Sequence, residues 1–225
     1  MRGIELRDAH VRYGPLEALH GITLAAPAAA LTVLLGRNGS GRTTALRALA
    51  GTLPLSAGAV RHDGRDITRS PAHERAARGL CFVPDRRAVF SSLTVAQNLE
   101  LSRADGGFGH ALTAYPELRP LLSRRAGTLS GGEQRMLALS RALLARASVI
   151  LVDEPTQGMS PPVAARSHAL LADLADPGTC VIVAEQRLPP AWRERASRTA
   201  VLVHELRRGA VVRSGEAAEF SAARE

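Results

Sequence analysis

A glycine-rich segment between an apolar run and a helix-forming run constrains the fold of this chain more than any other feature. The segment is GRNGSGRTT, residues 36–44; the apolar residues 31–35 precede it and ALRALA, residues 45–50, follows it. Strand, glycine-rich turn and helix in this order are the setting of a phosphate-binding loop, in which backbone N–H groups surround phosphate oxygens. The sequence therefore predicts an α/β fold with a phosphate site, with a simple helix-capping turn as the alternative.

One side chain in this segment departs from the usual pattern. Such loops carry lysine ahead of the hydroxyl residue, and here that position is Arg42, followed by Thr43. Arginine keeps the positive charge but is planar and bulkier than lysine. We expect the Thr43 hydroxyl to bind Mg²⁺. The residues expected to surround the phosphates are Gly36, Arg37, Asn38, Gly39, Ser40, Gly41, Arg42, Thr43 and Thr44.

A second apolar run ends in two acids. Residues 149–152 are VILV, and Asp153 and Glu154 follow them. This pattern is typical of a buried parallel strand that delivers carboxylates to the sheet edge where ligands gather. Asp153 can hold Mg²⁺, and Glu154 can orient and deprotonate an attacking water. The alternative is a strand followed by a solvated acidic turn.

A third segment is the most specific. Residues 129–134 are LSGGEQ, and a helical run extends from 135 to 146. Ser130 with two glycines at a helix start can form another anion-binding turn. A glycine helix cap would explain three of these six residues but not all six in this order.

With these segments in this order, the chain resembles the nucleotide-binding subunits of ABC (ATP-binding cassette) transporters. The resemblance covers nearly the whole chain and identifies 36–44 as the Walker A loop, 129–134 as the signature motif and 149–154 as Walker B. Four further positions match the family in order: Tyr13 as the adenine-stacking aromatic, Asp85 in the Q-loop, residues 158–160 as the loop after Walker B, and Gln186 as the switch residue.

Other segments are similar to one subfamily, the ATPases of branched-chain amino acid importers. These segments are residues 63–68, 83–90 and 93–99. The smaller ATPase of such systems carries an acidic Q-loop residue and a switch glutamine, as Asp85 and Gln186 do here. That family usually has glutamate where this chain has Asp85, and glycine at the next position.

The resemblance implies an ATPase that uses ATP and Mg²⁺. In the implied site Tyr13 stacks on adenine, and Asp85 contacts both the nucleotide and the metal ion. Thr43 and Asp153 bind the metal ion. Arg42, Glu154 and Gln186 take part in catalysis, with Glu154 as the base.

The resemblance also implies partners. Ser130, Gly131 and Gly132 would bind the nucleotide of a second ABC ATPase subunit in a heterodimer. Transmembrane permease subunits would bind the chain at the cytoplasmic face of the membrane, as a peripheral subunit, and an extracytoplasmic solute-binding protein would act indirectly. The alternative function is a catalytically weak subunit that binds ATP and completes its partner's site, which Arg42 favours.

Composition argues against two other classes. The net charge is +8, and all 29 basic residues are arginines scattered along the chain, with only 3% aromatics. A nucleic-acid binder is expected to gather its basic residues on one face beside stacking aromatics. No apolar run reaches the roughly 20 residues of a membrane-spanning helix. We therefore expect no nucleic-acid partner, and we expect other subunits to cross the membrane.

The alternation of apolar and helical segments predicts one domain, residues 1–225, of the P-loop ABC type: a RecA-like parallel sheet, an antiparallel N-terminal β part and a short helical lobe at about 86–146. Cys81 and Cys180 are expected in buried strands. Strands are expected at 4–6, 22–24, 31–35, 80–83, 149–152, 180–183 and 200–203, helices from Gly41, from Thr94 and over 132–146, and a hairpin at 208–209.

Overall fold

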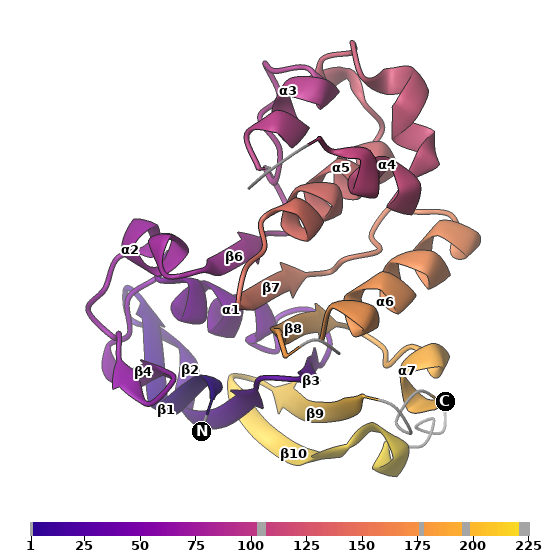
Figure 1. The fold of residues 1–225 in the computed structure, drawn as a ribbon. Helices are drawn as coiled ribbons and strands as arrows, with labels where there is room; N and C mark the ends of the chain where they lie inside the picture. Colours follow the sequence, from indigo (N-terminus) through magenta and orange to yellow (C-terminus); the bar gives the residue numbers. More distant parts are fainter. Residues whose placement is uncertain (1, 103–106, 176–177, 195–198, 221–225) are drawn as a thin grey trace.

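The chain forms two sheets and a helical lobe (Figure 1). The computed structural model describes residues 2–102, 107–175, 178–194 and 199–220. The strands are β1 (Gly3–Tyr13), β2 (Leu16–Pro27), β3 (Ala30–Leu35), β4 (Ala57–His62), β5 (Arg65–Asp66), β6 (Leu80–Val83), β7 (Val149–Asp153), β8 (Cys180–Glu185), β9 (Ala200–Arg207) and β10 (Ala210–Glu216). The α-helices are α1 (Arg42–Ala50), α2 (Ala72–Ala77), α3 (Val95–Glu100), α4 (Gly109–Ala114), α5 (Gly131–Leu144), α6 (Pro161–Ala175) and α7 (Pro190–Glu194). Short 3₁₀ helices cover η1 (Pro116–Leu121), η2 (Ala126–Thr128) and η4 (Ala217–Glu219).

The larger sheet has the strand order β10-β9-β3-β8-β7-β6. All neighbours in it pair in parallel except β9 and β10, which form the hairpin expected at 208–209. This confirms the predicted parallel core. Leu35 of β3 pairs with Glu185 of β8, and Ala184 pairs with Asp153 of β7. The segments that follow these three strands therefore meet at one sheet edge, where ligands bind in open α/β sheets.

The smaller sheet is antiparallel, with the order β2-β1-β4-β5. The strands expected at 4–6 and 22–24 are only short parts of β1 and β2. These two strands pair from Gly3 opposite Pro27 to Tyr13 opposite Leu16, because one hairpin carries both. The sequence analysis did not predict β4 and β5. Most residues in these strands are exposed or half-buried, so they lack the apolar run that would have marked them.

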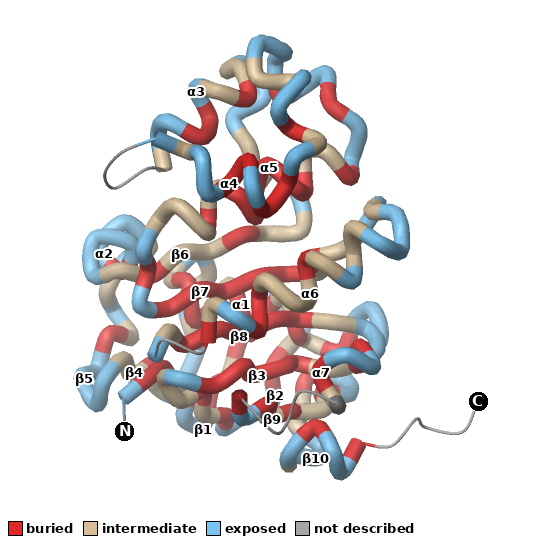
Figure 2. Tube along the Cα trace, turned by 45° about the vertical axis from the view of Figure 1, so that its right-hand side comes forward, coloured by how far each residue is buried: buried red, intermediate tan, exposed pale blue. Residues whose placement is uncertain are grey.

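Successive side chains of the larger sheet enter two different cores. Most of the length of its central strands is coloured as buried in Figure 2. Val33 of β3 joins the core that residues of α5 and α6 also line, whereas the next residue, Leu34, joins the core that contains α1 and the small sheet. This follows from the period of two along a strand. Helix α1 thereby packs between the two sheets, and its first turn lies at the end of β3.

The helical lobe, from α3 to α5, stands above the larger sheet in Figure 1. Two of its helices begin at capping boxes, in which the N-cap side chain accepts a hydrogen bond from the backbone N–H three residues on, and the side chain of that residue accepts one from the N-cap N–H. Thr94 with Gln97 caps α3, and Ser130 with Glu133 caps α5. Within the described part of the chain, no helix has the length and apolar character needed to cross a membrane.

The two cysteines differ in environment. Cys180 is buried as expected, and burial raises its pKa to about 12. Cys81 is only half-buried, contrary to expectation, because β6 is an edge strand of the larger sheet.

Candidate functional site

The phosphate loop connects β3 to α1 in a conformation that requires glycine. Gly41, the N-cap of α1, has φ of 105°, a region that side-chain-bearing residues rarely adopt. A Cβ on Gly36 would lie 2.5 Å from the Leu206 carbonyl oxygen. The backbone of Ser40 accepts a hydrogen bond from the N–H of Gly209 at 2.9 Å. The β9–β10 hairpin therefore fixes the loop beside the N-terminus of α1.

The three residues predicted to take part in catalysis lie together. Arg42 is 5% exposed, and its Nη2 donates to Glu154 Oε1 at 3.0 Å. Gln186 donates to the same oxygen through Nε2, also at 3.0 Å. The sequence analysis did not predict the Arg42–Glu154 ion pair, whose partners are 112 positions apart. One oxygen of the predicted base thus receives two donors.

Next to this ion pair, several buried polar atoms have no hydrogen-bond partner among the described residues. These atoms are both carboxylate oxygens of Asp153, Ser40 Oγ and Arg42 Nη1. Burial raises the pKa of Asp153; Asp85 adds to the rise, and Thr43 opposes it. A buried carboxylate that only the Thr43 hydroxyl approaches as a donor fits a cation, and a free hydroxyl and guanidinium N–H fit an anion. These atoms therefore fit Mg²⁺ and the phosphates of ATP.

Asp85 follows β6 and borders this group. Its carboxylate lies 3.9 Å from Arg47 Nη2 and 3.8 Å from Arg86 Nε. In the described part of the chain, no three His, Cys, Asp or Glu side chains gather in a metal-binding arrangement. A metal ion at Asp153 would therefore need further oxygens, from Thr43 and from the phosphates. The metal role of Asp85 stays a prediction.

Other predicted residues lie at the margin of the loop. Tyr13 ends β1 and is 43% exposed, so its ring is open to a stacking partner. Arg37, Asn38 and Gly39 are also exposed, whereas Thr44 is buried in α1.

The signature segment belongs to α5 rather than to the phosphate loop of its own chain. Ser130 Oγ accepts from the N–H of Glu133 at 3.3 Å, and Glu133 Oε2 accepts from the N–H of Ser130 at 2.7 Å. A Cβ on Gly132 would lie 2.6 Å from the Gly158 carbonyl oxygen, whereas a Cβ on Gly131 would meet nothing within 4 Å. Gly132 thus packs on the loop after β7, and Gly131 faces open space.

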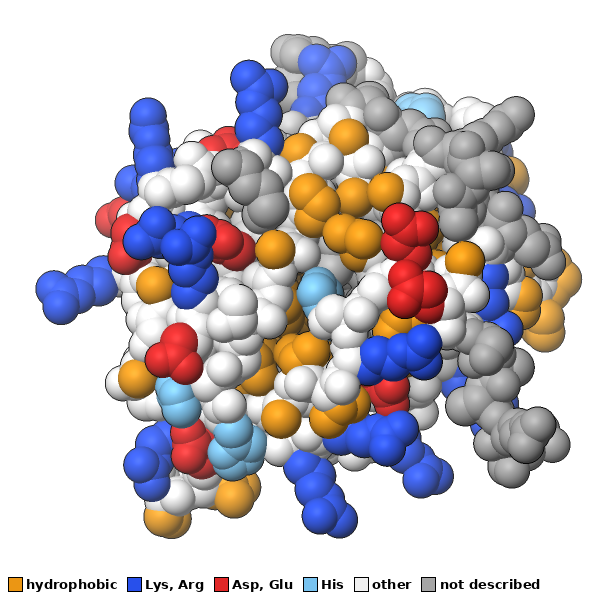
Figure 3. All heavy atoms as spheres, turned by 90° about the horizontal axis from the view of Figure 1, so that it is seen from below, with side chains coloured by type: hydrophobic (Ala, Val, Ile, Leu, Met, Phe, Trp, Pro, Cys, Tyr) orange, Lys and Arg blue, Asp and Glu red, His pale blue; other side chains and the backbone are white. Residues whose placement is uncertain are grey.

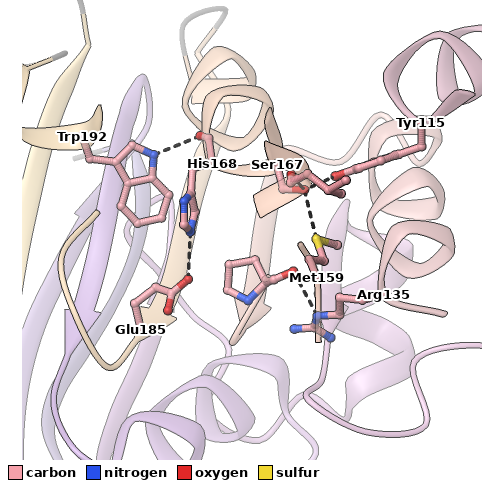
Figure 4. A network of polar contacts seen from close by, with 9 residues as sticks. Tyr115, Arg135, Met159, Ser167, His168, Glu185 and Trp192 are labelled. Atoms are coloured by element: carbon pink, nitrogen blue, oxygen red, sulfur yellow. Dashed lines mark hydrogen bonds and ion pairs between the residues drawn. The ribbon is translucent and has the colours of Figure 1, made fainter. Parts of the chain in front are cut away.

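The sequence analysis missed a polar network behind the switch residue (Figure 4). Glu185, which precedes Gln186, lies 3.1 Å from His168 Nε2 through its Oε1. Trp192 Nε1 donates to the His168 carbonyl oxygen at 2.9 Å. The centroids of the His168 and Trp192 rings are 4.8 Å apart, in an edge-on arrangement. Helices α6 and α7 therefore hold the end of β8. The sequence carried one sign of this network, because Glu185 is a polar residue at the end of β8 in addition to the predicted switch residue Gln186.

The family model and the curated relatives that match this chain all point to the same protein family. The family model described as ABC transporter matches residues 19–157. The high-affinity branched-chain amino acid transport ATP-binding protein BraG of Pseudomonas aeruginosa is 32% identical over 192 residues, which cover 80% of this chain and 81% of BraG. The probable branched-chain amino acid transport ATP-binding protein LivF of Archaeoglobus fulgidus is 40% identical over 138 residues, 58% of each chain. The sulfate/thiosulfate import ATP-binding protein CysA of Mycobacterium tuberculosis is 34% identical over 188 residues, 77% of this chain and 51% of CysA.

A solved structure shares the fold. The dimeric bacterial ABC transporter cassette MJ0796 superposes with a TM-score of 0.82 at 22% identity, covering 95% of this chain and 98% of that chain. The predicted cassette fold, a parallel core beside an antiparallel sheet, is thereby confirmed.

Proposed function

Because the chain belongs to the ABC transporter family, we propose that it is the ATP-hydrolysing subunit of an ABC importer. The observation that carries this proposal is the meeting of Arg42, Glu154 and Gln186 at one sheet edge, next to the unpartnered oxygens of Asp153. A base, a phosphate-binding cation and a metal-binding carboxylate are the groups that phosphoryl transfer to water requires.

The geometry supports the following order of contacts with ATP. The backbone of the loop and the free Ser40 Oγ and Arg42 Nη1 bind the phosphates. The γ-phosphate competes with Glu154 for the Arg42 guanidinium, which frees the carboxylate oxygen to accept a proton from the attacking water. Gln186 then holds Glu154 or the water in place. Thr43 and Asp153 would hold Mg²⁺, which when bound neutralises developing charge on the phosphates.

A second ATPase subunit completes this scheme. Gly131 faces open space beside the exposed Ser130, so another molecule can approach the start of α5 closely. We infer that this segment binds the partner's nucleotide in a heterodimer, and that permease subunits hold both ATPases at the cytoplasmic face of the membrane.

The spacing of the arginines on the face shown in Figure 3 argues against a nucleic-acid partner there. On the face shown in Figure 3 the basic side chains stand apart around the rim, with acidic ones between them. Electrostatic binding to a nucleic acid would favour one continuous basic surface.

Branched-chain or related amino acids are the proposed cargo. BraG and LivF carry that name, and residues 83–90 and 93–99 resemble their subfamily. CysA, whose name gives sulfate and thiosulfate import, matches a similar share of this chain. The comparisons therefore support the role of importer ATPase more strongly than they support one cargo.

Inspection of the neighbouring genes for a permease and a second ABC ATPase, followed by co-expression with them, tests the proposed function. We expect the chain to co-purify from membranes with both partners and the assembled complex to hydrolyse ATP. The chain alone should stay mostly monomeric in the presence of ATP. A chain that never associates with the permease, or a fast ATP-dependent homodimer, would contradict the proposal.

The Arg42→Lys variant tests the alternative of a catalytically weak subunit. Lysine is compact and extends to the β- and γ-phosphates, whereas Arg42 divides its donors between substrate and Glu154. We expect turnover of the complex to rise about 100-fold, the size of one transition-state contact. ATP affinity should change less, because the loop backbone still binds the phosphates.

The control for this measurement is Arg78→Lys, which makes the same change at an exposed position at the C-terminal end of α2. It should leave turnover unchanged. If Arg42→Lys brings no gain, Arg42 is an adapted catalytic residue and the weak-site alternative is wrong.

A further inference from the structure

A buried arginine on α5 connects two loops that border the candidate site. Arg135 is 5% exposed, and its Nη1 donates to the Pro84 carbonyl oxygen at 2.6 Å. Its Nε donates to the Pro155 carbonyl oxygen at 3.3 Å (Figure 4). Pro84 directly precedes Asp85, and Pro155 directly follows Glu154. One guanidinium thus holds the backbone next to both acids.

The backbone at Glu154 needs such support. Glu154 has φ of 47°, in the left-handed region, although it is not glycine. That conformation costs roughly 1–3 kcal/mol and persists only where neighbours hold it. On one side the Glu154 N–H donates to the Ala184 carbonyl oxygen at 3.0 Å. On the other side the Glu154 carbonyl accepts from the Gln157 N–H at 3.4 Å, and Arg135 binds the next carbonyl, that of Pro155.

The charge of Arg135 also suits this place. Burial lowers its pKa, and four carboxylates oppose this effect: Asp153, Asp85, Glu185 and Glu154. Its Nη2 is buried and has no hydrogen-bond partner among the described residues. Arg135 is therefore a buried counter-charge for the acids of the candidate site. Lysine could not replace it, because a single ammonium lacks the fork that spans two carbonyls.

We propose that Arg135 is a positioning residue that holds Glu154 and Asp85 in register with each other and with the start of α5. This inference rests on the proposed function, since it assigns Glu154 the role of base. Arg135 lies in the second turn of α5, four residues after Gly131, and any displacement of the signature segment reaches both acids through this one side chain.

The test is steady-state ATP hydrolysis by the assembled complex with Arg135→Met, which keeps much of the side-chain volume but removes the charge and the donors. Because a 1 Å misplacement can cost up to about 100-fold in rate, we expect kcat to fall about 10-fold or more. The KM for ATP should stay within about twofold, because the two carbonyls that Arg135 binds lie outside the loop residues 36–44. Arg135→Lys, which retains the charge but lacks the planar fork that reaches both carbonyls, should show a smaller fall in kcat.

Arg141→Met is the matched control. Arg141 lies on the same helix, and it also donates twice, to Ser102 Oγ and to the Ala88 carbonyl oxygen, both at 2.9 Å. Neither acceptor adjoins Asp85 or Glu154. We expect this variant to lose thermal stability with kcat within about threefold of wild type.

Three results would overturn the inference. One is an unchanged kcat in both Arg135 variants. Another is a rise in the KM for ATP well beyond twofold, which would place the effect on ATP binding and not on the position of the acids. The third is an equal kcat loss in Arg141→Met, which would indicate a general structural effect. A wild-type complex without ATP turnover would instead overturn the proposed function and this inference with it.

Discussion

Complexes that carry Glu154→Gln are expected to lose ATP turnover about 1,000-fold, within the range of a removed general base. The amide keeps the shape of the carboxylate and can still accept hydrogen bonds from Arg42 and Gln186, which now reach it at 3.0 Å. It cannot take a proton from water. ATP affinity should therefore change by less than about threefold, and the bound ATP should trap the closed dimer.

The measurements are phosphate release by the purified complex and size-exclusion chromatography with ATP. Glu117→Gln is the matched control, because Glu117 forms its ion pair with Arg166 at the helical lobe, outside the site. That variant should hydrolyse ATP at the wild-type rate. Undiminished turnover in Glu154→Gln would remove Glu154 from the role of base.

Arg75→Met is expected to lower the free energy of unfolding by about 4 kcal/mol, the cost of breaking a buried charged network. Arg75 is 3% exposed and binds five backbone carbonyls. Two of these, Ala48 and Leu49 at 2.8 and 2.7 Å, belong to the last turn of α1. The positive charge also meets the negative end of that helix. Methionine would fill the space but remove all five hydrogen bonds; the Ala48 and Ile67 carbonyls would each keep a backbone N–H donor, and the others would lose the donor that Arg75 supplies.

Urea unfolding of the isolated chain measures this effect. Arg78→Met is the control three residues further on, where the exposed side chain pairs with Glu74 only at 4.0 Å. The control should lie within about 0.5 kcal/mol of wild type. A loss below about 1 kcal/mol in Arg75→Met would contradict a structural role for the guanidinium.

Arg135 shows what closer inspection of the sequence could have found. Ala138, Leu139 and Ala142 form a buried face of α5, and Arg135 lies three, four and seven residues before them. A charged residue in register with such a face must be buried. Buried arginines need acceptors, but the spacing along one helix does not say which loops supply them.

The sequence by itself determined the parts that depend on neighbours in the chain. Glycine spacing specified the turn between β3 and α1, apolar runs marked β7 and β8, and Ser130 with Gly131 and Gly132 marked the start of α5. These features are readable because a capping side chain or a left-handed turn acts within about four residues.

Only the tertiary structure decided which of these parts meet. The order β3-β8-β7 brings Arg42, Gln186 and Glu154 to one edge, although Arg42 and Glu154 are 112 positions apart. The same holds for Arg135, whose acceptors lie 51 and 20 positions away. Hydrogen bonds and ion pairs act over a few ångströms, so their partners follow from the pairing of strands and not from local sequence. The residues of the site could therefore be predicted one by one, whereas the ion pair between Arg42 and Glu154 is a property of the folded sheet.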